Sequence, residues 1–160
     1  MGAVQAGRWT HEGSDGVVVF SLGMRVNRPW AVHRWLPVLL AMPPMIAELA
    51  RDPGRGHLGT STVLGAGGPR VLQYWRSAED LWAYAADPSG HHRPAWAAFN
   101  RRARSARGAV GIWHETHVVP PGASESVYVD MPVVGLARAT GSVPVARRGD
   151  TLRERLAGAA

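Results

Sequence analysis

One segment limits the possible folds of this chain more than any other. Residues 16–26 (GVVVFSLGMRV) are apolar or β-branched at nearly every position, so a strand formed there has two apolar faces. Such a strand belongs inside a sheet, with a layer packed against each side. The fold must therefore provide one layer of helices and a second cover.

The rest of the sequence supplies helices and further strands. Residues 30–50 predict a helix that is broken at its prolines, with Asn27 as a candidate cap, and Ser77 is a good cap for a second helix. The order strand, helix, strand, strand, helix, strand is the ferredoxin-like βαββαβ arrangement of an α+β protein. The later strands are predicted at residues 57–66, 71–76, 110–119 and 126–130, and the later helices at 78–86 and 92–105.

A sheet of this kind carries helices on one face only, so its other face needs a cover. We expect a homodimer in which a second copy supplies it; the alternative is a monomer capped by its own ends. Residues 1–15 lack periodicity and predict a flexible N-terminal arm. Residues 16–135 form the predicted domain, a ferredoxin-like α+β barrel, and residues 136–160 are expected to be a loosely ordered C-terminal tail.

Composition excludes several classes of function. Every one of the 18 basic residues is Arg, and Cys is absent, which removes Schiff-base lysines, P-loop lysines, thiolate nucleophiles and Cys-bound metals. The arginines cluster at residues 101–107 and in the tail, a pattern typical of a solvated surface, so we expect no nucleic-acid partner. Residues 36–47 are too short for a membrane span, and no signal peptide is visible, so we expect a cytoplasmic protein without membrane contact.

The chain has seven tryptophans, more than a core of this size usually needs. Because they come from different predicted elements, we expect several to converge on one aromatic pocket for an apolar ligand. Plain core packing is the alternative for each ring. The candidate pocket residues are Trp35, Tyr74, Trp75, Trp96 and Trp113.

Two segments carry histidines that are candidates for chemistry. His92 lies at a predicted helix start, where the helix dipole disfavours protonation, which suits a general base or an iron ligand. A surface or capping role is the alternative, and His91 is a possible substitute. In residues 111–117 (GIWHETH), His114 is a second candidate base or a core histidine.

A period of two along this strand places Glu115 and His117 together on the face opposite His114. We expect Glu115 and His117 to form either a proton-transfer pair or a structural ion pair. Because His114 and His117 point to opposite faces, no zinc site is expected, and we predict no other metal site. Asn27 and Arg76, near strand ends, are candidates to bind a substrate oxyanion or to hold a loop.

Several runs occur together in order, and they carry a family resemblance: GMRVN at 23–27, QYWRS at 73–77, AW at 95–96 and GIWHET at 111–116. Over residues 16–140 the chain resembles the monooxygenase-like family that includes the monooxygenase of the fungal fumagillin pathway. The resemblance implies the dimeric α+β barrel superfamily, which holds cofactor-independent monooxygenases and haem-binding relatives. His117 departs from the family pattern, in which a Tyr is expected.

The leading hypothesis is a monooxygenase-like enzyme of secondary metabolism that tailors an apolar small molecule and requires no cofactor. Its base would be His92 or His114, and its oxyanion partner Asn27 or Arg76. One rival is a haem-binding enzyme of the same fold with His92 or His114 as axial ligand. The other is a non-catalytic ligand-binding protein or a cyclase.

Overall fold

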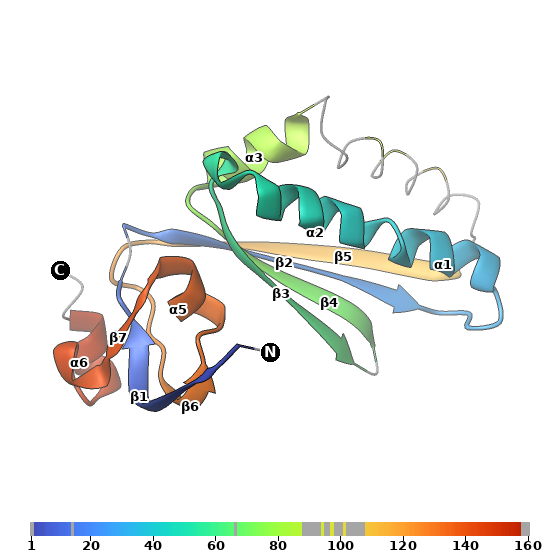
Figure 1. The fold of residues 1–160 in the computed structure, drawn as a ribbon. Coiled ribbons are helices and arrows are strands. Elements are labelled where there is room, and N and C mark those ends of the chain that lie inside the picture. The colour runs from blue at the N-terminus through green and yellow to red at the C-terminus, as the bar shows by residue number, and fades with distance from the viewer. Residues whose placement is uncertain are drawn as a thin grey trace.

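A computed structural model describes residues 2–13, 15–65, 67–87 and 108–157, together with Pro94, Ala97 and Arg101. Within these residues, four antiparallel strands form a main sheet in the order β3-β4-β2-β5, and helices cover one of its faces (Figure 1). This is the ferredoxin-like α+β fold that the order of elements predicted. The strands are β2 (Val17–Val26), β3 (His57–Gly65), β4 (Gly68–Trp75) and β5 (Val110–Val119).

The helix predicted at residues 30–50 is two helices, α1 (Val32–Leu39) and α2 (Met42–Arg51), followed by the short 3₁₀ helix η1 (Pro53–Arg55). Prolines at the first positions of α2 suit a helix start, because those N–H groups have no partner within the helix. Asn27 is not the cap of α1. Its side-chain amide instead donates to the carbonyl of Gly108 (3.0 Å) and so joins the end of β2 to the start of β5.

Helix α3 (Ala78–Ala86) begins where the sequence predicted it. The Ser77 hydroxyl accepts a hydrogen bond from the backbone N–H of Asp80 (3.0 Å), so Ser77 is the predicted N-cap. Against the sheet, α3 contributes Leu81 and Tyr84 to a core around Trp75, which is fully buried. This cluster closes one end of the helix layer.

Both ends of the chain differ from the prediction of a flexible arm and a loose tail. They form a second, three-stranded sheet in the order β6-β1-β7. Figure 1 shows this small sheet at one end of the main sheet, on the side away from the helices. Its elements are β1 (Val4–His11), β6 (Tyr128–Pro132), α5 (Gly135–Thr140), β7 (Ser142–Pro144), the 3₁₀ helix η2 (Val145–Arg147) and α6 (Leu152–Ala157).

Polar groups hold the two ends of the chain together. His11 is 1% exposed, and its two ring nitrogens lie 3.0 Å from the hydroxyl of Ser126 and 3.2 Å from that of Ser124. The buried Arg155 of α6 forms an ion pair with Glu125. These bonds order segments that have no apolar pattern, because the buried side chains of His11 and Arg155 are each satisfied by partners far away along the chain.

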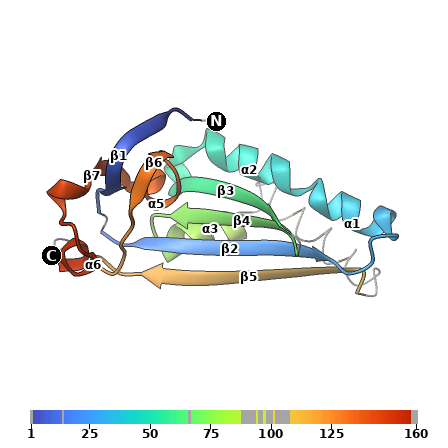
Figure 2. The same ribbon diagram turned by 90° about the horizontal axis from the view of Figure 1, so that it is seen from below.

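Figure 2 looks onto the face of the main sheet that carries no helices. Helix α5 contacts β3 and lies with β6 over one end of this face. Tyr74 of β4 is half-buried there, and burial raises the pKa of its phenol. Among the described helices, none is long and apolar enough to cross a bilayer.

Candidate functional site

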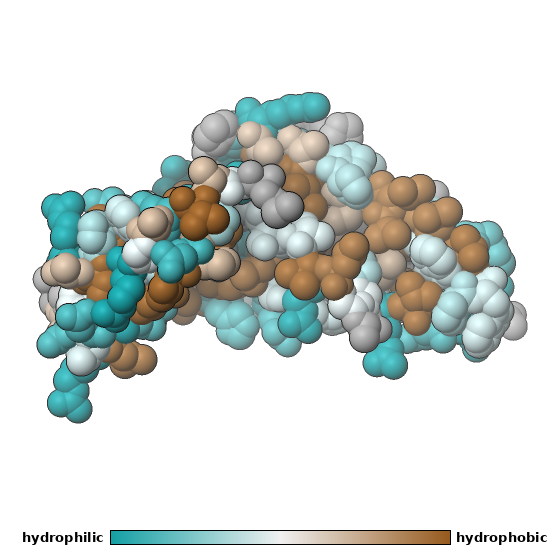
Figure 3. Space-filling model, turned by 60° about the horizontal axis from the view of Figure 1, so that its bottom comes forward, coloured by the Kyte–Doolittle hydropathy of each residue, from teal (hydrophilic) through white to brown (hydrophobic). Residues whose placement is uncertain are grey.

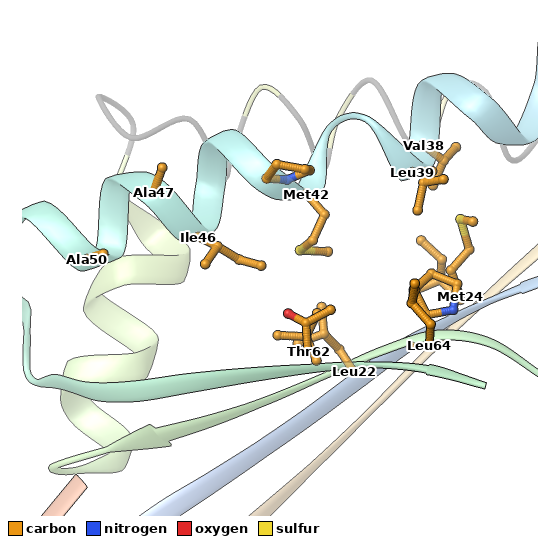
Figure 4. A pocket seen from close by; sticks show the side chains of 15 residues that line it. Leu22, Met24, Val38, Leu39, Met42, Ile46, Ala47, Ala50, Thr62 and Leu64 are labelled. Atoms are coloured by element: carbon orange, nitrogen blue, oxygen red, sulfur yellow. The ribbon is translucent and has the colours of Figure 1, made fainter. Parts of the chain in front are cut away.

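A cavity of about 410 Å³ lies between the α1–α2 layer and the main sheet. This volume is within the range of small-molecule sites, about 300 to 1,000 Å³. Figure 4 shows its roof of helix side chains above its floor of strand side chains. The roof residues are Val38, Leu39, Met42, Pro43, Ile46, Ala47 and Ala50.

The floor follows from the strand register. Residues paired across antiparallel strands point to the same face, so one row crosses the whole sheet from Thr62 through Val71 and Leu22 to His114. The adjacent part of the floor contains Met24 and Ile112, which are a cross-strand pair. Leu22 and Val71 of the row line the cavity, and Thr62 lines it at the β3 edge.

The cavity opens to solvent between α2 and β3, because Ala47 and Ala50 on one side and Thr62 and Leu64 on the other are exposed. Figure 3 shows that apolar side chains also gather on the outer surface of this half of the molecule, away from the small sheet. Leu64, near the tip of the β3–β4 hairpin, is 80% exposed. Apart from Thr62, the named residues at the entrance are therefore apolar, as is the described interior.

His114 lies beside this cavity. It is the cross-strand partner of Leu22 and is two residues from Ile112, both of which line the cavity. Its ring is 5.7 Å from that of Phe20, and its side chain is exposed. The structure thus places the candidate base at the β5 edge of the floor, next to the lining residues rather than among them.

Glu115 and His117 lie on the opposite face of the sheet, as the period of two predicted. Their Oε2 and Nε2 atoms are 3.8 Å apart, and both side chains are more than 60% exposed. They share no surface with the cavity because β5 separates them from it. The pair is thus not positioned to act with His114 on a ligand held there.

Asn27 and Arg76 are both occupied outside the cavity. Besides the bond from Asn27 to Gly108, Arg76 makes two hydrogen bonds to the carboxylate of Asp80, each 2.9 Å long. This carboxylate keeps the pKa of Arg76 above its usual value. Neither side chain lines the cavity, so the structure does not place the expected oxyanion partners near His114.

The predicted convergence of aromatic rings on one pocket is wrong for the described residues. Trp75 is packed in the core with Tyr84, and the indole N–H of Trp35 donates to the carbonyl of Pro29 (3.0 Å). Trp113 lies on the far face of the sheet, beneath Arg70, and Tyr74 lies on that face too. None of Trp35, Tyr74, Trp75 and Trp113 lines the cavity.

Two further candidates, His92 and Trp96, and the possible substitute His91, lie outside the described residues. Within the described part of the chain, no group of three His, Asp or Glu side chains could hold a metal ion. The described lining does not fit haem either. It offers only the thioethers of Met24 and Met42 as axial ligands and no charged group to pair with the propionates.

The residues that do form the cavity were not among those predicted from the sequence. Met42 and Ile46 are four residues apart and so share one face of α2, which was a readable signal of a buried helix face. Thr62 gave no such signal, because its position opposite Val71 depends on the register of the β3–β4 hairpin.

Fold and site together define a class: an α+β protein of ferredoxin-like fold with an apolar small-molecule cavity between its helices and its sheet. The family model described as Monooxygenase af470-like matches residues 17–136. The chain belongs to this family.

One curated protein supports this membership, and one solved structure shares the fold. The chain is 31% identical over 155 residues to the curated protein "Monooxygenase af470" of Aspergillus fumigatus, a match that covers 89% of this chain and 52% of that protein. The chain therefore spans about half the length of the curated relative. A crystal structure of an aldoxime dehydratase in complex with butyraldoxime has the same fold, with a TM-score of 0.69 and 18% identity over 88% of this chain and 44% of that one.

Proposed function

We propose that this chain is a monooxygenase-like oxidoreductase that oxidises an apolar small molecule held between α1–α2 and the main sheet. The observation that carries the proposal is the cavity itself: its described lining is apolar except for one threonine, and His114 lies beside it at the β5 edge. Family membership supports an oxidative reaction. We further propose that the substrate is a polyketide- or terpenoid-like molecule of secondary metabolism and that the protein works in the cytoplasm.

The proposed reaction needs no cofactor. His114 removes a proton from an acidic CH₂ group of the substrate, and the electron pair left on carbon forms a C–O bond with O₂. The resulting peroxide takes up the proton, and loss of water then leaves a carbonyl group, so that CH₂ and O₂ become C=O and H₂O. The apolar lining holds the rest of the substrate, while the carbanion forms beside His114 at the β5 edge.

A non-catalytic ligand-binding protein, or a cyclase that only shapes its substrate, is the second candidate. It is favoured by the described lining, in which no side chain is ionisable. For the haem alternative, we derive no step, because the described lining offers neither an imidazole nor a charged side chain. We expect the purified protein to show no Soret band after incubation with haemin.

We also propose a homodimer in which the second copy packs on the face of the main sheet opposite the helices. Val19 and Leu72 lie on that face, next to the polar residues Ser21 and Glu115. Both apolar side chains are only partly buried, so the helix layer on the other face and the chain's own ends leave part of this apolar surface exposed to solvent.

Oxidation of anthrone tests the proposed activity. Anthrone is an apolar ketone whose CH₂ group reacts with O₂ once it is deprotonated. We expect the wild type to consume O₂ and form anthraquinone, and His114→Gln to be at least 100-fold slower. His117→Gln, on the opposite face, is the matched control and should stay within twofold of wild type.

Two results would overturn the proposal. Wild-type rates in His114→Gln would remove the base. Anthrone that binds without any turnover in the wild type would favour the ligand-binding protein.

A further inference from the structure

Among the described residues that line the cavity, one has a polar side chain: Thr62, which is exposed at the β3 edge. Figure 4 shows the oxygen of Thr62 on the cavity side of β3, turned toward the helices. The described residues of the roof above it, among them Met42 and Ile46, all have apolar side chains. In the described part of the chain no residue forms a hydrogen bond with this hydroxyl, whereas the neighbouring Thr60 lies 2.7 Å from the Nε2 atom of His57.

Thr62 and His114 lie at opposite ends of one cross-strand row. The row runs over Val71 and Leu22, so three strand spacings separate its ends, a distance of about 14 Å between their backbones. Both central residues are apolar and line the cavity. Among the side chains of this row, an elongated molecule lying along it therefore meets a polar group at each end and apolar groups between them.

A free hydroxyl in an apolar site selects for a polar group on the ligand. The hydroxyl of Thr62 can donate one hydrogen bond and accept others, so it can bind either a carbonyl or a hydroxyl. A ligand without such a group forms no hydrogen bond with Thr62 and displaces part of the water around this exposed hydroxyl. One correctly placed polar group thus fixes the orientation of an apolar ligand.

We propose that Thr62 is the positioning residue that orients the substrate. The substrate class is an elongated apolar molecule with a hydroxyl or carbonyl at one end; Thr62 binds that end and so directs the other end to the β5 edge. The assignment of this second end as the reacting one rests on the proposed role of His114.

Binding of two matched ligands tests the proposal without any turnover. 1-Octanol carries a hydroxyl group, whereas 1-fluorooctane has the same chain with a much weaker acceptor. Dissociation constants come from chemical-shift titrations, which also locate the ligand through the amides of Leu22 and Val71. The variants are Thr62→Val, which keeps the shape and removes the hydroxyl, Thr62→Ser, which keeps the hydroxyl, and Ser61→Ala, which removes a hydroxyl from the opposite face.

We expect Thr62→Val to weaken 1-octanol binding by about 3- to 10-fold, the effect of one hydrogen bond, and to leave 1-fluorooctane binding unchanged or tighter. Thr62→Ser and Ser61→Ala should bind 1-octanol within twofold of wild type. An unchanged affinity of Thr62→Val for 1-octanol would overturn the proposal, and so would binding that shifts no cavity amide.

These outcomes are separate from those for the proposed function. The variant His114→Gln should bind both ligands as the wild type does. If it loses anthrone oxidation while Thr62→Val binds 1-octanol normally, only the role of Thr62 fails. If Thr62→Val shows the expected loss while His114→Gln stays active, only the role of His114 fails.

Discussion

Substitution of Gly23 by Ala tests the arrangement of the floor of the cavity and of the residues behind it. Gly23 is buried in β2, and its cross-strand partners are Arg70 and Trp113. A methyl group on its α-carbon would lie 2.6 Å from two atoms of the Trp113 indole, 0.8 Å short of the 3.4 Å at which ordinary contact begins. The indole would have to shift, and it already lies beneath the guanidinium of Arg70, 5.1 Å from the ring centroid to Cζ.

The loss in the free energy of unfolding follows from this overlap. Forcing a methyl group into a packed site usually costs about 1 to 3 kcal/mol, and loss of an exposed cation–π contact about 0.5 to 1 kcal/mol. We expect Gly23→Ala to lower the free energy of unfolding by about 2 kcal/mol. Gly111→Ala in β5 is the matched control, because its methyl group would lie 3.7 Å from the nearest atom, an ordinary contact.

Urea denaturation followed by circular dichroism, at one fixed protein concentration, measures both variants. In a Trp113→Val background the indole is gone, so Gly23→Ala should then cost less than about 0.5 kcal/mol, and the two substitutions should not be additive. Equal stabilities of Gly23→Ala and Gly111→Ala would refute the packing of Trp113 on Gly23.

Two further predictions concern pH and assembly. The pKa of His11 lies below its ordinary value of 6.5, mainly because burial desolvates its ring and also because Arg148 is near, and burial likewise lowers the pKa of His57. Below about pH 6.5 the unfolded chain therefore binds protons that the folded chain does not. The free energy of unfolding should thus decrease as the pH is lowered from about 7.5 to about 5.5 and stay constant above about pH 7.5. His57→Gln should make this decrease smaller, and an equal decrease in the variant would contradict the role of His57. For assembly, sedimentation should give the mass of two chains for the wild type and of one chain for Val19→Arg on the open sheet face, whereas a wild-type monomer would contradict the dimer.

The sequence predicted the main sheet and its helices well, because their signals are local. Residues 110–119 and 78–86 form β5 and α3 with the predicted limits. The period of two in β5 also placed His114 and Glu115 on opposite faces, as the register confirms. Such patterns fix the two faces of one strand without knowledge of any other element.

The sequence did not reveal the small sheet, because its order depends on distant polar partners. The last residues of β1, Thr10 and His11, are fully buried but polar, so they produce no apolar alternation. The hydroxyl of Ser126, which bonds His11, is 115 positions away along the chain. No local sequence pattern predicts a hydrogen bond between residues so far apart in the chain.

The predicted convergence of aromatic rings on one pocket was wrong for a related reason. Trp75 pairs with Val18 and therefore faces the helices, whereas Trp113 pairs with Gly23 and faces away from them. A sequence shows which residues of one strand share a face, but the register between strands decides which faces of two strands coincide. Thr62 could not be recognised as a cavity residue without the same information.

Methionine methyl signals test the central claim most directly, namely that the apolar cavity between the helices and the main sheet is the ligand site. Met24 and Met42 line the cavity, whereas Met131 is exposed on the small sheet. With ¹³C-methyl methionine, addition of anthrone should shift the signals of Met24 and Met42 and leave that of Met131 unchanged. Turnover of anthrone with no shift of Met24 or Met42 would contradict the account.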